Sequence, residues 1–166
     1  MEPTATRVWK RLSREERLAA ATHFWREPSD EVVGSALSAV VKARHVRPQV
    51  ARALPPEEQA RALAGVLDPG EALAAALLVA LHLGERRPLL ATFLDAAGLR
   101  HEDGILHDEE DVQPLPEAAA REGVRALAGA YPREQVETYL NTLWLQDPDR
   151  WRVLERSVDW IRSPSP

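Results

Sequence analysis

The sequence predicts an all-α protein: a single irregular or orthogonal bundle of about eight helices around a central apolar helix at residues 72–83, with a long acidic loop at residues 99–116. The 166 residues include 26 Ala and 22 Leu but only 2 Ile, and Ala and Leu lose little side-chain entropy in a helix. Apolar residues recur at helical spacing through most of the chain. Proline, glycine and capping residues separate these segments at the positions where helices begin and end.

Capping residues delimit the first two helices. Ser13 and Glu16 have the spacing of a capping box, in which a hydroxyl and a carboxylate satisfy two backbone donors at a helix start. This start separates a short helix around Trp9 from a second helix that ends at Pro28. Two short helices are therefore expected before residue 29.

The next three helices begin at polar residues or prolines. Ser29 and Asp30 can cap a third helix, whose apolar residues recur at helical spacing as far as Val41. Pro48 and Pro56 suit first helical positions, where the missing amide hydrogen is no loss. A short fourth helix and a fifth helix are expected from these prolines.

Residues 72–83 are the most apolar segment of the chain, and His82 is their one polar residue. Residues 68–71 open this helix, and Gly84 is expected to close it in a left-handed conformation. A helix of this length without a polar face belongs in a core. It is too short for a bilayer, which requires about 20 residues.

A seventh helix is expected at residues 88–97 and should end at Gly98. Residues 99–116 have no helical period and contain prolines and Gly104. They predict a long loop with a brief extended piece at residues 105–106. Loops of this length are uncommon and tend to be functional or disordered.

Three helices are expected after this loop. The first occupies residues 117–130, and Pro132 begins the second. Residues 147–148, an Asp-Pro pair, begin the last helix. Its apolar seam consists of Trp151, Leu154, Val158 and Ile161.

The length predicts one domain at residues 1–166. If that domain divides, the halves are residues 1–98 and 117–162, joined by the acidic loop. The chain has no cysteine, which excludes disulfides and thiolate metal sites. The first residues lack a basic segment followed by an apolar core, so we expect no signal peptide and a cytoplasmic location.

Charge is unevenly distributed along the chain, whose net charge is −5. Residues 101–117 contain seven acidic residues and no Lys or Arg. No acidic residue lies between Glu31 and Glu57, a region with four basic residues. The acidic set is Glu102, Asp103, Asp108, Glu109, Glu110, Asp111 and Glu117, and the basic set is Lys42, Arg44, Arg47 and Arg52.

The acidic loop contains a candidate metal site formed by His101, Asp103, His107 and Asp108. Imidazole and carboxylate ligands suit zinc, nickel or manganese. The pattern differs from the HExxH motif and from the calcium-binding EF-hand. It indicates a metal-binding protein or a metal-dependent hydrolase as one alternative, and a solvated loop as the simpler interpretation.

Other residues indicate binding rather than catalysis. The chain has no nucleophile elbow and no glycine-rich phosphate loop, so we expect no catalytic residues and no cofactor. Trp144 adjoins Leu143 of the preceding apolar stripe, whereas Trp160 lies off the stripe of the last helix. A tryptophan off the stripe either packs on another element or marks an interface. Together with Arg44 and Arg47 they are candidate partner-binding residues.

The leading functional hypothesis is a non-catalytic protein–protein interaction or regulatory domain. Its partner would be another protein or a second copy, and no membrane is expected. Weak nucleic-acid binding through residues 42–52 is a further alternative. It is disfavoured by the sequence pI of about 5.6, because nucleic-acid-binding domains are usually basic. No motif identifies a family.

Overall fold

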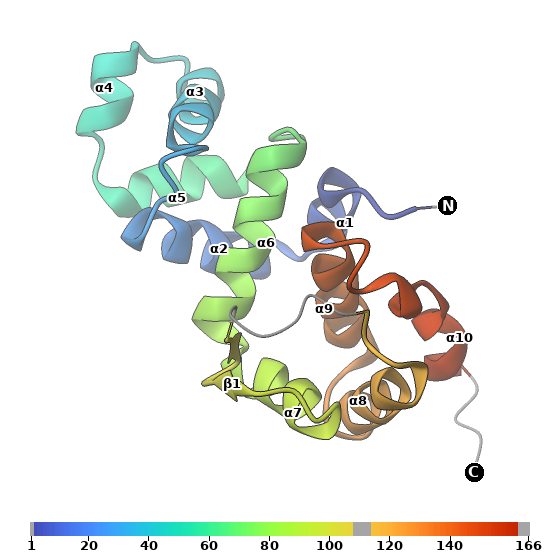
Figure 1. Ribbon diagram of the computed structural model, residues 1–166. Coiled ribbons are helices and arrows are strands. Elements are labelled where there is room, and N and C mark those ends of the chain that lie inside the picture. Colours follow the sequence, from blue (N-terminus) through green and yellow to red (C-terminus); the bar gives the residue numbers. More distant parts are fainter. Residues whose placement is uncertain (1, 108–113, 163–166) are drawn as a thin grey trace. The chain divides into compact units, whose positions relative to one another are not determined.

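The computed structural model describes residues 2–107 and 114–162 (Figure 1). These residues contain ten α-helices, one 3-10 helix and one two-stranded hairpin, so the all-α fold class is confirmed. The chain divides into two compact units, residues 1–85 and 86–166. The sequence predicted that any division would fall at the acidic loop, between residues 98 and 117. The observed boundary lies before that loop. We describe each unit separately.

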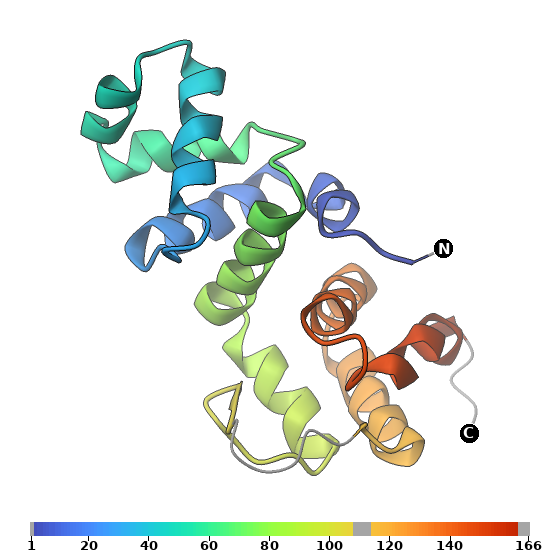
Figure 2. The same ribbon diagram turned by 45° about the horizontal axis from the view of Figure 1, so that its top comes forward.

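Unit 1 (residues 1–85) consists of six helices. They are α1 (Ala5–Arg11), α2 (Arg14–Arg26), α3 (Val33–Arg44), α4 (Pro48–Ala53), α5 (Pro56–Ala64) and α6 (Glu71–Glu85). Helix α6 packs against α1 and α2, whereas α5 packs against α2 and α3. Helix α4 packs on α3, and Figures 1 and 2 show these two helices and α5 as one corner of the unit.

Helix α6 forms much of the core of unit 1, as its apolar sequence predicts. Leu73, Leu77, Leu78 and Leu81 are each at most 1% exposed, and full burial of one such side chain stabilises a fold by about 1.5–3 kcal/mol. Trp9 of α1 is also fully buried. Its indole N–H donates a 2.8 Å hydrogen bond to the Val66 carbonyl oxygen.

Most of the expected helix starts in unit 1 are confirmed. The capping box is present, with the Ser13 amide donating to Glu16 and the Glu16 amide donating to the Ser13 hydroxyl. Helices α4 and α5 begin at Pro48 and Pro56. The prediction that Ser29 and Asp30 cap α3 was wrong. The Ser29 carbonyl instead accepts the amides of the next turn, and α3 begins at Val33 without a side-chain cap.

Gly84 does not cap α6 in a left-handed conformation, so that expectation was wrong. The helix continues through Gly84 to Glu85, and Gly84 is not among the positive-φ residues. A Cβ at this position would collide with the imidazole ring of His23 on α2. His23 Nε2 lies 2.9 Å from Glu85 Oε1. Glycine is therefore present because α2 approaches α6 closely here.

Unit 2 (residues 86–166) is also mainly helical. Its elements are α7 (Arg87–Ala96), β1 (His101–Glu102), β2 (Ile105–Leu106), α8 (Glu117–Ala130), α9 (Arg133–Gln146), the 3-10 helix η1 (Arg152–Arg156) and α10 (Ser157–Arg162). Phe93 is fully buried at the centre of an aromatic cluster. Its ring centroid lies 5.6 Å from that of Tyr139 and 6.1 Å from that of Trp151. Burial raises the pKa of the Tyr139 hydroxyl.

The expected loop at residues 99–116 contains an antiparallel hairpin in its described part, in which His101 pairs with Leu106. The expected extended piece at residues 105–106 is its second strand. Asp103 and Gly104 have φ values of 50° and 85°, as a two-residue hairpin turn requires. A Cβ at Gly104 would approach Leu90 of α7 too closely. Residues 108–113 lie outside the described residues.

The last expected helix does not form as one element. A turn follows residues 147–148, and the 3-10 helix η1 then precedes α10. The Leu154 amide donates to the Trp151 carbonyl oxygen at 2.8 Å. Side chains three residues apart align on a 3-10 helix, and both residues are buried. The tighter helix therefore directs Trp151 and Leu154 into the same core.

Candidate functional site

A broad groove of about 1250 Å³ lies in unit 1, between α3, α4, α5 and the start of α2. We call it the basic groove, because its lining contains five basic side chains and one acidic side chain. The basic residues are Arg14, Lys42, Arg44, Arg52 and Arg61, and the acidic residue is Asp68. The lining therefore has a formal charge of +4.

The exposed face of α3 forms one wall of the basic groove. Gly34, Ser35, Ser38 and Ala39 line the groove at consecutive turns of the helix, whereas Val40 is fully buried. Helical periodicity separates the two faces, because residues three or four apart share a face. Small side chains on this wall leave the groove open, and the two serines add hydroxyl groups that can donate hydrogen bonds.

Two of the five cations share one carboxylate. Glu58 on α5 accepts a hydrogen bond from Arg44 at 2.6 Å and another from Arg61 at 2.8 Å. Asp68 is paired outside the lining, with Lys10 at 3.5 Å. These exposed pairs neutralise only part of the charge that lines the groove.

The other three cations, Arg14, Lys42 and Arg52, form no ion pair with any residue in the described part of unit 1. They come from three different helices, α2, α3 and α4. Their like charges repel one another, although solvent and salt reduce this repulsion at the surface. An anionic ligand would therefore find three basic groups that have no competing partner in the described part of unit 1.

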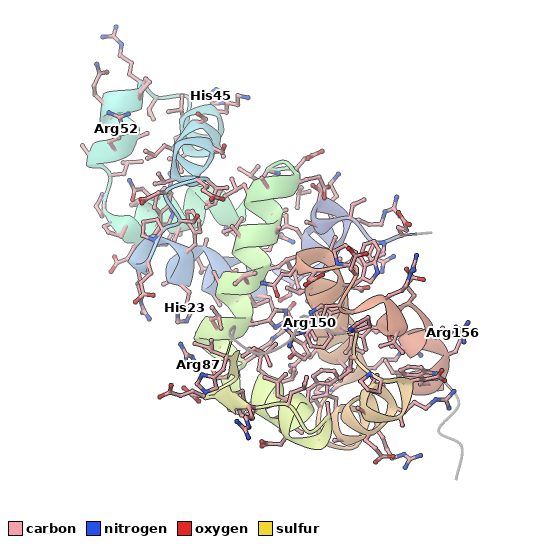
Figure 3. The ribbon with its side chains drawn as sticks, in the orientation of Figure 1. His23, His45, Arg52, Arg87, Arg150 and Arg156 are labelled. Atoms are coloured by element: carbon pink, nitrogen blue, oxygen red, sulfur yellow. The ribbon has the colours of Figure 1, made fainter. Side chains whose placement is uncertain are left out.

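The position of α4, and hence of Arg52, is fixed from two sides. The Gln59 side chain on α5 donates a 2.9 Å hydrogen bond to the Ala51 carbonyl oxygen. Ala51 is fully buried in a small apolar cluster with Val40. Figure 3 shows that His45 and Arg52 lie on the corner formed by α3 and α4. The basic groove is thus built on a packed scaffold.

Leu67 and Val50 are large apolar side chains exposed on unit 1, and Leu67 lies beside residues that line the basic groove. Leu67 is 51% exposed and lies between two lining residues, Val66 and Asp68. Val50 on α4 is 46% exposed. Apolar side chains next to a basic surface offer contacts that a purely ionic ligand would leave unused.

Arg44 and Arg47, the candidate partner-binding residues of the basic stretch, do not lie on the same surface feature. Arg44 lines the basic groove, whereas Arg47 is the exposed N-cap residue of α4 and does not line it. Sequence position alone does not place Arg14 and Arg61 on one surface with the basic stretch. Arg14 precedes Lys42 by 28 residues, and Arg61 follows Arg52 by nine residues on another helix. Only the packing of α2 and α5 brings them to the groove.

The candidate metal ligands have other partners or are not described. His101 Nε2 lies 2.8 Å from Asp95 Oδ1, and its Nδ1 accepts the Gly104 amide at 3.0 Å. Asp103 accepts a 3.0 Å hydrogen bond from Arg87. His107 is exposed, and Asp108 lies outside the described residues. Among residues 2–107 and 114–162, no three His, Asp or Glu side chains form a possible metal-binding group.

The two candidate interface tryptophans have different surroundings. Trp144 on α9 is half-buried, and its buried indole N–H has no hydrogen-bond acceptor among the residues that the structure describes. Trp160 on α10 is half-buried and lies beneath the guanidinium of Arg121, 5.0 Å from the ring centroid. It lines a cavity in unit 2 that is separate from the basic groove.

No helix in the described parts of the chain has the length and hydrophobicity needed to span a bilayer. Comparisons with protein-family models, curated proteins and solved structures give no match.

Proposed function

We propose that this chain is a non-catalytic interaction domain whose basic groove binds an acidic segment of a partner protein. The observation that carries the proposal is the lining charge of +4, with Arg14, Lys42 and Arg52 lacking ion pairs among the described residues of unit 1. An extended or helical segment rich in Asp and Glu would supply the missing carboxylates. The proposal includes a cytoplasmic setting for this interaction.

Charge alone would give weak binding, because an exposed ion pair contributes about 0–1 kcal/mol. The partner segment therefore needs apolar residues as well. Leu67, which is exposed between the lining residues Val66 and Asp68, offers such a contact. Apolar side chains and arginines are typical of protein interfaces, where a few residues dominate the affinity. The expected ligand is thus both acidic and apolar.

Nucleic acid is a less suitable ligand for the basic groove. Unit 1 contains eleven acidic and eleven basic residues, and the whole chain has a net charge of −5. A polyanion would meet little long-range attraction. The groove also has no aromatic residue in its lining on which a base could stack. These features favour a protein segment.

The metal-dependent alternative has less support than the basic groove. Both ring nitrogens of His101 are engaged within the hairpin and with Asp95. Binding a metal there would require at least one of these hydrogen bonds to break. We therefore propose no catalytic role for the hairpin.

Fluorescence anisotropy with labelled probes tests the proposal. The first probe is a synthetic amphipathic peptide of Glu and Leu, and its control replaces every Glu by Gln. A DNA duplex and a peptide of this chain's residues 101–117 carry the same label. The acidic peptide should bind more tightly than the other three probes. Tighter binding of the duplex, of the Gln peptide or of the 101–117 peptide would overturn the proposal. Tighter binding of the 101–117 peptide would indicate that the groove binds a second copy of this chain.

Charge reversal locates the binding site. The double variant Lys42→Glu/Arg52→Glu should bind the acidic peptide about tenfold more weakly, which corresponds to 1.4 kcal/mol. The double variant Arg11→Glu/Arg26→Glu is its matched control, because it changes the net charge equally at exposed residues of unit 1 outside the groove lining. Equal losses in both variants would show that net charge, rather than the basic groove, governs binding.

A further inference from the structure

A second cavity, of about 510 Å³, lies within unit 2 between α8, the start of α9 and α10. We call it the α8–α10 cavity. Its apolar lining includes Val124 and Val136, which are at most 1% exposed. Two aromatic residues, Tyr131 and Trp160, also line it. Pockets that bind small molecules are commonly about 300–1000 Å³ and mostly apolar, with a few polar groups that orient the ligand.

Three guanidinium groups accompany this apolar lining, from Arg121 and Arg125 on α8 and Arg133 on α9. No acidic residue of the described parts of the chain belongs to the lining. The planar guanidinium group matches carboxylate and phosphate geometry, because it can donate two parallel hydrogen bonds. The cavity thus combines an apolar surface with donors suited to one anionic group.

Each of the three arginines is paired with a glutamate on its own helix. The nitrogen–oxygen distances are 2.9 Å for Arg121–Glu117, 3.1 Å for Arg125–Glu122 and 2.7 Å for Arg133–Glu137. All three arginine side chains are more than half exposed. Such exposed pairs contribute about 0–1 kcal/mol each. A ligand anion can therefore replace one of these glutamates at small cost, and the glutamate stays solvated.

Arg121 is also held over the ring of Trp160, with its guanidinium carbon 5.0 Å from the ring centroid. A cation over an indole ring is electrostatically favourable. This contact places a charged donor beside an aromatic surface. An aromatic ligand with an acidic group would contact both.

The cavity wall is open at Gly129 of α8. A Cβ built at this glycine meets no atom within 4 Å, and its φ is not in the left-handed region. A larger side chain at this position can thus project into open space without backbone strain. Ala72 on α6 of unit 1 is exposed and lines neither this cavity nor the basic groove, so it supplies a control.

From these observations we infer that the α8–α10 cavity binds a small amphipathic anion, an aromatic or branched aliphatic carboxylate. Its apolar body would lie against the half-buried Tyr131, Trp160 and Ile161, and its carboxylate would accept hydrogen bonds from the arginines. This site shares no residue with the basic groove. Either proposal can therefore fail while the other stands.

Calorimetric titration of the full chain with 1-naphthaleneacetate tests this inference, with neutral 1-naphthaleneacetamide as the matched probe. The carboxylate should bind about tenfold more tightly than the amide, because charge-assisted hydrogen bonds are roughly twice as strong as neutral ones. Equal affinities for the two probes would overturn the inference. So would the absence of saturable binding at millimolar carboxylate.

Two sets of variants place the binding event. Gly129→Leu should weaken carboxylate binding about tenfold or more by filling the cavity, whereas Ala72→Leu should leave it unchanged. Arg121→Gln/Arg133→Gln should remove the preference for the carboxylate, and Arg152→Gln, outside the cavity lining, should retain it. Circular dichroism verifies that each variant is folded. If Gly129→Leu does not fold, the arginine variants decide whether the carboxylate binds in the cavity. Retained affinity and preference in both cavity variants would show that the anion binds elsewhere.

Discussion

The carboxylate of Glu71, at the start of α6, accepts hydrogen bonds from the first turn of α1. Its Oε2 lies 2.8 Å from the Ala5 amide nitrogen, and its Oε1 lies 3.2 Å from the Thr6 amide nitrogen. The first amides of a helix have no partner within the helix, and a carboxylate is favoured at that end by the helix dipole. One side chain thus links two helices that are 65 residues apart in sequence.

We expect Glu71→Ala to destabilise unit 1 by about 1 kcal/mol, the typical cost of losing a helix cap. A hydrogen bond from the Thr6 side chain, with the backbone amides of Thr6 and Ala5, lowers the pKa of Glu71 from its usual 4.5. Because the folded-state pKa is lowered, this contribution is complete above the unfolded-state value and disappears as pH falls through the folded-state value. Urea unfolding of both proteins should show the difference at neutral pH and lose it in acid. A difference that persists unchanged in acid would contradict this assignment.

Gly84→Ala should destabilise unit 1 by about 1–3 kcal/mol, the usual cost of overpacking. The added Cβ would collide with the ring of His23. Gly34→Ala is the matched control, since its Cβ meets nothing within 4 Å. Alanine is favoured over glycine in a helix by about 0.5–1 kcal/mol, so the control should be neutral or stabilised. Equal unfolding free energies for the two variants would show that α2 and α6 are not in close contact.

Leu78→Ala should cost about 2–5 kcal/mol, because it removes a fully buried side chain from α6 and leaves a cavity. Leu67→Ala removes the same atoms from a side chain that is 51% exposed. Its effect on stability should stay within about 0.5 kcal/mol. Denaturant unfolding of the two variants compares a core with a surface position. A loss below 1 kcal/mol for Leu78→Ala would mean that α6 is peripheral.

Replacing Gly104 by Ala should destabilise the β1–β2 hairpin. The residue has a φ of 85°, and an added Cβ would approach Leu90 of α7 too closely. Hydrogen exchange of amides at residues 101–106 should therefore accelerate in this variant, whereas exchange in α9 should change little. Unchanged protection of the hairpin would show that its turn does not depend on this glycine.

The local rules of helix termination made much of the fold predictable. Ser13 with Glu16, Pro48 and Pro56 each mark a helix start through chemistry within a few residues. Gly84 was misinterpreted because its role depends on His23, which is 61 positions away. The hairpin had a local signal, the Asp103-Gly104 pair, which favours a two-residue turn.

The candidate site was less predictable than the fold. Lys42, Arg44 and Arg52 are conspicuous in a stretch without acidic residues. Arg14 and Arg61 join them only because α2, α3 and α5 pack together. His101 appeared to be a metal ligand because sequence shows neither its hydrogen bond with Asp95 nor that with Gly104.

The salt dependence of acidic-peptide binding tests the central claim, that the basic groove attracts carboxylates through three cations that form no ion pair among the described residues of unit 1. Raising the salt concentration from about 0.1 M to 1 M shortens the screening length from about 10 Å to 3 Å. The parent protein should therefore bind the Glu/Leu peptide much more weakly at high salt. Lys42→Glu/Arg52→Glu should bind it weakly at both concentrations. Salt-independent affinity in the parent, or an equally steep salt dependence in the double variant, would contradict the account.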